Sequence, residues 1–188
     1  WKAANRAMNF HDFLGNTRVA ETLRRLVVED TLPQTLLFSG PRGVGKATLA
    51  RIVAAAINCD QGRGEICGAC SNCLRILRAD LAGDEFQTQL EARDKLTSVQ
   101  RAENPLIVST HPDFLIFPPD GPLRIITIEQ ARRLRHAAAF GPSEGRHRVF
   151  LIDHADRANS EAANSLLKTL EEPAPSLTLI LTAENPYD

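Results

Sequence analysis

The chain has 188 residues, of which 43% are apolar and 24% are charged, and its formal net charge is −1. This length fits one domain or a domain with a small insert, and the composition can supply an apolar core. A nearly neutral chain argues against binding nucleic acid through a wholly basic surface, although a local basic patch stays open. No run of eighteen apolar residues occurs, so we expect no membrane span.

The two ends of the chain carry little structural signal. The stretch from Trp1 to Met8 lacks the apolar core of a signal peptide, and residues 1–7 are either a tag remnant or an upstream segment. We expect residues 184–188 to form a loop after a strand, as in a chain cut within a longer protein. The missing signal and the clustered cysteines predict a cytoplasmic location.

The first half of the chain alternates apolar and polar segments. Apolar side chains at helical spacing predict a helix over 17–29, and a short apolar run predicts a buried strand over 35–39. A second helix, rich in Ala, Leu, Ile and Val, is expected over 46–57. All four cysteines follow this helix. The next stretch, 74–102, is mixed and charged, and we expect it to be helical in part.

Strands and helices continue to alternate in the second half. Thr127 and Gln130 form a capping box at the start of one helix. A second helix is capped by Asn159 or Ser160 and is stopped by Pro173. The expected helices reach about residue 140 and residue 172, and the expected strands cover 113–117, 124–126, 148–152 and 177–181.

This order of elements indicates an α/β fold in which a parallel sheet is flanked by helices on both faces. Sheets of this kind bind ligands at the carboxyl ends of their strands. We find no internal repeat and no low-complexity tract. Candidate binding residues are therefore expected where the strands end.

Residues 40–46 fit a phosphate-binding loop as far as its lysine, and they lie between an expected strand and an expected helix. Glycines let the backbone wrap a phosphate, the first amides of the helix point at it, and Lys46 reaches the terminal phosphates. The alternative is a Gly-rich turn before a helix. The predicted nucleotide-binding residues are Gly40, Gly43, Val44, Gly45, Lys46, Ala47, Thr48 and Asp153.

The complete motif has Ser or Thr directly after the lysine, because that hydroxyl holds magnesium. Here this residue is Ala47, and Thr48 lies about 100° further round the helix, so we do not expect Thr48 to replace the hydroxyl. ATP or ADP could still bind through the loop amides and Lys46. Magnesium would lack one of its usual ligands.

The expected strand 148–152 ends at Asp153, which is typical of the second nucleotide motif, whose Asp holds magnesium. Hydrolysing members of this class have Glu next, which polarises the attacking water, whereas this chain has His154. His154 is otherwise simply a polar residue at a strand end. Because a water-positioning group contributes roughly 10²–10⁴-fold to rate, the two changes predict nucleotide binding without turnover, and we assign no catalytic residue.

The cysteines are Cys59, Cys67, Cys70 and Cys73, spaced C-x7-C-x2-C-x2-C. Four thiolates within fifteen residues are typical of a tetrahedral zinc site. Disulfides are the rival interpretation, and the absence of a secretion signal disfavours them. Four protein ligands leave no open position, so we expect a structural zinc that folds a small module inserted over residues 59–78.

The chain resembles the clamp-loader ATPases of bacterial DNA polymerase III, which belong to the AAA+ class. The resemblance covers residues 10–186, and four stretches carry it: 13–16, 40–46, 59–73 and the Ser-Leu-Leu-Lys-Thr-Leu-Glu-Glu-Pro string at 165–173. It implies an AAA+ nucleotide-binding domain over residues 1–188, with the small lid domain and the collar domain absent from this sequence.

Two kinds of subunit compete within this family. The gamma/tau kind hydrolyses ATP and has Asp-Glu at the strand end, whereas the delta-prime kind is often degenerate there. Ala47 and His154 resemble the delta-prime kind, as do the stretches 111–113, 125–134 and 153–157. The resemblance implies a ring of five subunits, including gamma/tau and delta, that opens a sliding clamp and places it on primed DNA. The arginine finger of delta-prime would lie beyond residue 188.

Three alternatives remain open. One is a hydrolysing gamma/tau motor, and another is a structural ring subunit that binds no nucleotide. The third, a small phosphate-loop kinase or nucleotidase, is disfavoured by the cysteines and by the string at 165–173.

The stretch 79–109 is longer than the family leads us to expect, with a solvated helix as its default interpretation. The basic run at 132–135 is either a solvated face or a nucleic-acid contact, and a polar sensor around 182–185 matches only loosely.

Overall fold

The computed structural model describes residues 8–62 and 64–185. The expectation for residues 1–7, and the part of the expected loop at 186–188, lie outside these residues. Five strands form one sheet in the order β1-β5-β4-β3-β2. The strands are β1 (Thr35–Ser39), β2 (Val108–His111), β3 (Phe114–Phe117), β4 (Arg148–Ile152) and β5 (Leu177–Ala183). The α-helices are α1 (Thr17–Val28), α2 (Lys46–Asn58), α3 (Ser71–Leu77), α4 (Asp84–Asp94), α5 (Ser98–Glu103), α6 (Ile128–Ala138) and α7 (Ser160–Glu171).

The sheet is parallel from β1 through β5 and β4 to β3, but β2 runs antiparallel to β3. The expectation of a wholly parallel sheet is therefore wrong at this edge. Only Pro112 and Asp113 separate β2 from β3, and so short a connection can join neighbouring strands only as an antiparallel pair. The expected strand at 124–126 is also wrong, since Ile125 and Ile126 make only isolated bridges, to Asp120 and Ala158.

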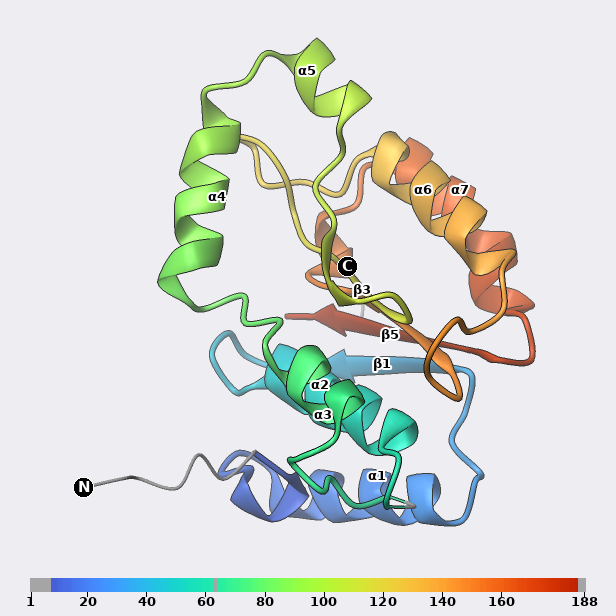
Figure 1. Cartoon of the computed structure of the whole chain (residues 1–188). Helices are drawn as coiled ribbons and strands as arrows, with labels where there is room; N and C mark the ends of the chain where they lie inside the picture. The colour runs from blue at the N-terminus through green and yellow to red at the C-terminus, as the bar shows by residue number, and fades with distance from the viewer. Residues whose placement is uncertain (1–7, 63, 186–188) are drawn as a thin grey trace.

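Helices cover both faces of the sheet, as the alternation of elements predicts (Figure 1). Successive side chains of a strand point to opposite faces, and β4 shows the consequence. Val149 and Leu151 join the apolar core that packs against α1, α2 and α3. Phe150 and Ile152 join a second core that packs against α6 and α7. A strand buried on both faces leaves its carboxyl end as the place where a ligand can approach.

The predicted helix starts are confirmed. Thr127 Oγ1 accepts a hydrogen bond from the Gln130 amide, and Gln130 Oε1 accepts one from the Thr127 amide, at 3.4 and 2.9 Å. Asn159 caps α7 by accepting from the Ala162 amide at 2.8 Å, so the cap is Asn159 and not Ser160. Side-chain capping of this kind satisfies amides that the first helical turn leaves without partners.

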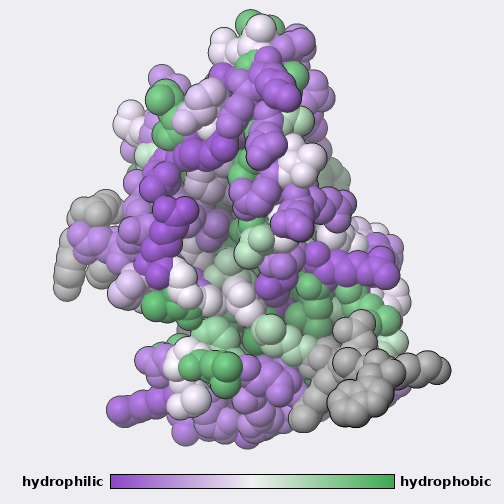
Figure 2. Space-filling model, turned by 90° about the vertical axis from the view of Figure 1, so that its left-hand side faces the viewer, coloured by the Kyte–Doolittle hydropathy of each residue, from purple (hydrophilic) through white to green (hydrophobic). Residues whose placement is uncertain are grey.

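The charged stretch 74–102 is partly helical, as expected. It contains the end of α3 and most of a helical arm, which we define as residues 84–103 and which comprises α4 and α5 (Figure 1, green). Phe86 and Leu90 of α4 pack with Leu106 in a small apolar cluster of their own. Figure 2 views the molecule from the side toward which β1 and β5 point, and the upper part of that face is mostly hydrophilic.

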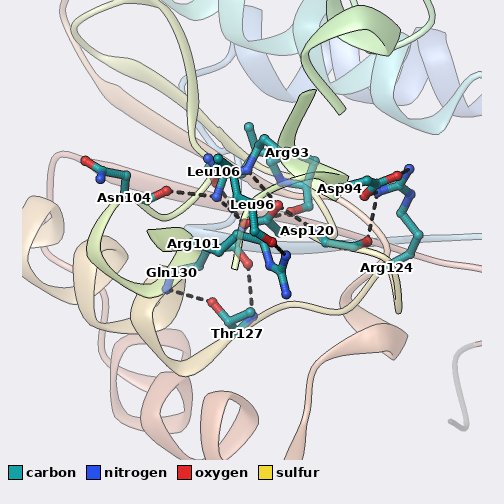
Figure 3. Close-up of polar contacts among 12 residues, drawn as sticks. Arg93, Asp94, Leu96, Arg101, Asn104, Leu106, Asp120, Arg124, Thr127 and Gln130 are labelled. Carbon is teal, nitrogen blue, oxygen red and sulfur yellow. Dashed lines mark hydrogen bonds and ion pairs between the residues drawn. The ribbon is translucent and has the colours of Figure 1, made fainter. Parts of the chain in front are cut away.

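Ion pairs fasten the arm to the connection between β3 and α6 (Figure 3). Arg93 binds both carboxylate oxygens of Asp120, at 2.7 and 2.5 Å, and the Asp120 side chain is only 2% exposed. Its neighbour Asp94 accepts two hydrogen bonds from Arg124, at 2.8 and 2.9 Å, in a more exposed position.

Within the described residues, no helix is both long and apolar enough to cross a membrane.

Candidate functional site

The phosphate loop closes with a backbone that only glycine adopts easily. Gly43 and Gly45 have φ of 82° and 89°, and Gly45 is the N-cap of α2. A Cβ on Gly45 would also lie 2.7 Å from the ring of Phe13. This position therefore requires glycine for its dihedral angle and for its packing. The result is a tight turn that delivers the first amides of α2 to the carboxyl end of β1.

The loop lysine lies across the loop itself. Lys46 Nζ donates to the carbonyl oxygens of Gly40 and Pro41, at 2.7 and 3.0 Å. Both carbonyls belong to the backbone that would surround a bound phosphate. The ammonium group is thus held at the loop by weak neutral acceptors, and a phosphate oxygen would be a stronger partner for it.

A cavity of about 290 Å³ lies in front of this loop. That volume is at the small end of ligand pockets, which usually measure about 300–1,000 Å³. Of the predicted residues, Gly43, Gly45, Lys46, Ala47, Thr48 and Asp153 line it, whereas Gly40 and Val44 do not. Six further residues complete the lining: Arg42, Arg51, Asp80, Leu81, Ala82 and His154.

At the end of β4, Asp153 is held by a residue of the neighbouring strand. Thr182 of β5 is fully buried, and its Oγ1 donates to Asp153 Oδ1 at 2.7 Å while accepting from the His154 amide at 2.8 Å. The sequence alone did not assign the polar sensor expected around residues 182–185. The structure places Thr182 beside Asp153. Of the two buried threonines of β5, Thr178 and Thr182, Thr182 is the one near the carboxyl end of the strand, and that position was the signal that could have identified it.

His154 adopts a left-handed backbone, with φ of 52°. Its ring nitrogens lie 3.9 Å from Asp153 Oδ2 and 3.8 Å from Glu184 Oε1, both beyond hydrogen-bond distance. Neither of these two carboxylates therefore holds the ring by a hydrogen bond. In the hydrolysing subunits that this chain resembles, a carboxylate is expected at this position. Here the cavity has an imidazole instead.

The first turns of α2 supply the remaining wall. Ala47 contributes only a methyl group to the cavity, and Thr48 Oγ1 accepts from Arg51 Nη2 at 3.4 Å. The Thr48 hydroxyl thus faces the next turn of its own helix. Arg51 was missed in the sequence, although it lies four residues after Ala47 and so on the same face of the helix.

The four cysteines converge as predicted. Their sulfurs lie within 4.8 Å of one another and could hold a metal ion, and none is in a disulfide. Zinc–sulfur bonds of about 2.3 Å in a tetrahedral site would place the sulfurs about 3.8 Å apart. The donor set therefore fits a tetrahedral metal site after a small contraction.

Backbone amides surround the sulfurs. Cys59 Sγ accepts from the Cys67 amide, Cys67 Sγ from the amides of Ala69 and Cys70, and Cys70 Sγ from the Cys73 amide, at 3.3–3.5 Å. The Ala69 and Cys70 amides lower the pKa of Cys67 to about 7, whereas burial raises the pKa of Cys73. Amides that point at sulfur stabilise thiolates, which are the form that binds metal.

A buried polar network joins the cysteine module to the sheet. Asn72 donates to the Asn58 carbonyl at 3.1 Å, and its Oδ1 lies 2.9 Å from His111 Nε2. His111 Nδ1 accepts from the Asp113 amide at 3.1 Å, and Asp113 in turn accepts from three amides of residues 143–145. The module is therefore continuous with β2 and with the loop before β4.

Comparison with known proteins gives one consistent family. A model described as "DNA polymerase III, delta subunit" matches residues 15–188. The tau subunit of DNA polymerase III from Bacillus subtilis is 27% identical over 183 residues, which are 97% of this chain and 27% of that protein. The delta-prime subunit from the same organism is 29% identical over 171 residues, which are 90% of this chain and 42% of that protein.

This chain therefore spans less than half the length of either relative. Among solved structures, a DNA polymerase III gamma subunit-related protein from Thermotoga maritima matches with a TM-score of 0.48 and 18% identity, over 87% of this chain and 38% of that one. The family assignment comes from the sequence matches.

Proposed function

The chain belongs to the DNA polymerase III delta subunit family, and from this premise we propose that it is the nucleotide-binding part of a delta-prime-type clamp-loader subunit. In this proposal the cavity holds ATP or ADP without hydrolysing it. The subunit would assemble with gamma/tau and delta subunits in the cytoplasm and help place a sliding clamp on primed DNA.

One observation carries this proposal. The phosphate loop and the Asp at the end of β4 face one cavity, and the two side chains expected to support hydrolysis there are replaced by others. Lys46 and Asp153 line the cavity together with Ala47 and His154. The hydroxyl that would hold magnesium is absent at residue 47, and the carboxylate that would polarise water is absent at residue 154. Phosphate binding through amides and a lysine needs neither group.

Zinc is the metal we propose for the cysteines, because four thiolates in tetrahedral reach suit it. Cys59, Cys67, Cys70 and Cys73 would hold it, and they leave no position for substrate. When bound, the metal supplies cross-linking and no chemistry. The proposed domain arrangement is an AAA+ core over residues 1–188 with the zinc module at 59–78.

Titration of the protein with fluorescent ATP and ADP, first with magnesium and then with a chelator, tests the nucleotide proposal. We expect weak binding that depends little on magnesium, and negligible phosphate release. The double variant Ala47→Thr with His154→Glu should make binding depend on magnesium, because it restores both groups. Absence of binding would leave a structural ring subunit instead.

A hydrolysing gamma/tau-type ATPase is the second candidate, and the tau matches favour it. They cover 96–97% of this chain, against 90% for the delta-prime match. This candidate requires turnover by a site without the two groups named above. Magnesium-dependent phosphate release by the unmodified protein, lost in Lys46→Met, would establish it and overturn the delta-prime proposal.

A further inference from the structure

Three cationic side chains line the nucleotide cavity, whereas the phosphate-loop motif accounts for only one. Besides Lys46, Arg42 and Arg51 contribute to the wall. Arg42 is exposed. The Arg51 side chain is only 13% exposed and is therefore held in place by the fold. A largely buried guanidinium on a cavity wall is a strong candidate partner for phosphate.

Arg51 points along α2 toward the phosphate loop. Its Nη2 lies 3.4 Å from Thr48 Oγ1, one turn nearer the helix N-terminus. Side chains on an α-helix lean toward the N-terminus, and this is the end where the loop amides would hold phosphate. Because Ala47 ends in a methyl group, no polar side chain at that position competes for the same space.

The guanidinium already has internal partners. Arg51 Nη1 donates to the Leu77 carbonyl oxygen at 3.3 Å, and a carboxylate pairs with Nη2. Asp80 Oδ1 lies 3.3 Å from Arg51 Nη2 and lines the same cavity. The Asp80 side chain is 50% exposed, so solvent screens this pair and its contribution is small, about 0.2–1 kcal/mol. A polyphosphate carries more charge and can accept two parallel hydrogen bonds from Arg, which makes it the stronger partner.

We infer that Arg51 is a phosphate-binding residue of this pocket, and that Asp80 is a built-in substitute for phosphate which Arg51 releases when a nucleotide binds. This inference rests on the proposed nucleotide binding. Lys46 and Arg51 then supply the positive charge that Lys46 and magnesium supply where the loop hydroxyl is present. The exchange is of one anion for another, and no bond is made or broken.

The exchange has a structural consequence for the helical arm. Asp80 precedes Leu81 and Ala82, which also line the cavity, and Gly83 is the N-cap of α4. Releasing Asp80 removes a contact just before the arm begins, while the Arg93–Asp120 pair still holds the end of α4. Backbone amides of residues 79–83 should therefore exchange hydrogen faster when nucleotide is bound.

Calorimetric titration with ADP in the presence of a chelator tests the inference with matched variants. Asp80→Asn should bind ADP about three- to fivefold more tightly, because it removes the internal competitor. Asp84→Asn removes the same charge from an exposed position that does not line the cavity, and it should leave the affinity unchanged. Arg51→Gln should weaken binding about tenfold or more, with Arg51→Lys in between.

The outcomes separate the inference from the proposed function. If the unmodified protein binds ADP and Asp80→Asn binds it no more tightly, Asp80 and Arg51 form only a structural clasp and the inference is wrong. If neither protein binds ADP, the proposed nucleotide binding fails and the inference fails with it. Urea unfolding of every variant identifies any loss of binding that comes from a loss of folding, and Asp80→Asn gives the decisive result even if Arg51→Gln does not fold.

Discussion

The cysteine module and the cavity in front of the phosphate loop lie at the two ends of α2 and are built in opposite ways. The module takes its four sulfurs from fifteen consecutive residues and closes them with its own amides. The cavity takes its wall from the phosphate loop, the segment 80–82 and the end of β4, which lie far apart in the sequence. The first site is nearly complete without the sheet, whereas the second exists only because the sheet brings distant segments together.

Replacing one of the four cysteines should give the largest effect. We expect Cys70→Ser to lose bound zinc and to lower the free energy of unfolding on the order of 4 kcal/mol, because metal binding to such a module is folding energy. Elemental analysis and denaturant unfolding measure both quantities. Ser71→Ala, an exposed neighbour that is not a ligand, serves as the control. If the unmodified protein contains no metal, the comparison between a metal-bound module and a cavity formed by the sheet is wrong.

The anchor of the helical arm tests how much distant contacts contribute. Arg93→Met leaves the buried Asp120 carboxylate without its ion-pair partner and should lower the free energy of unfolding by about 3 kcal/mol. Arg124→Met breaks the more exposed pair with Asp94 and should cost less than about 1 kcal/mol. Equal losses in thermal or urea unfolding would show that burial does not separate the two pairs.

Lys46→Met should weaken nucleotide binding and leave the stability of the fold nearly unchanged. Among the described residues, Lys46 bonds only the loop's own carbonyls, so the free energy of unfolding should change by less than about 0.5 kcal/mol. The affinity for ADP should fall about tenfold or more, since a charge-assisted bond to phosphate is lost. A stability loss as large as that of Cys70→Ser would mean that the loop, like the module, is a folding element.

The smallest effect concerns the network between the module and the sheet. Burial, with the nearby charge of Arg75, holds the pKa of His111 below its usual 6.5. Because Nδ1 accepts from the Asp113 amide, the neutral ring carries its proton on Nε2 and donates to Asn72. The unfolded chain takes up a proton first as pH falls, so this stability is present above about 6.5 and is lost as pH falls through the lower folded pKa.

His111→Gln should therefore flatten the stability profile below about pH 6.5. Some dependence should remain, because burial also lowers the pKa of His147. Urea unfolding at several pH values gives the profile. An unchanged slope in the variant would mean that His111 does not titrate between the two states.

Local signals predicted most of the fold. The bounds of β1 and β4, and the caps of α6 and α7, followed from apolar runs and from capping residues close in the sequence. The antiparallel β2 was missed because Val108–His111 shows no clear alternation and pairs only on one side. The strand expected at 124–126 failed because Ile125 and Ile126 find single bridging partners and no ladder.

The sequence by itself determined the sites whose chemistry is local: the cysteine spacing, the glycine loop with Lys46, and the replacements at Ala47 and His154. Their geometry is set by covalent spacing and by the backbone that glycine permits. Only the tertiary structure decided that Arg51 and Asp80 share the cavity and that Thr182 holds Asp153. Those contacts depend on the order of strands in the sheet and on where the arm begins. Neither can be predicted from the positions of these residues along the chain.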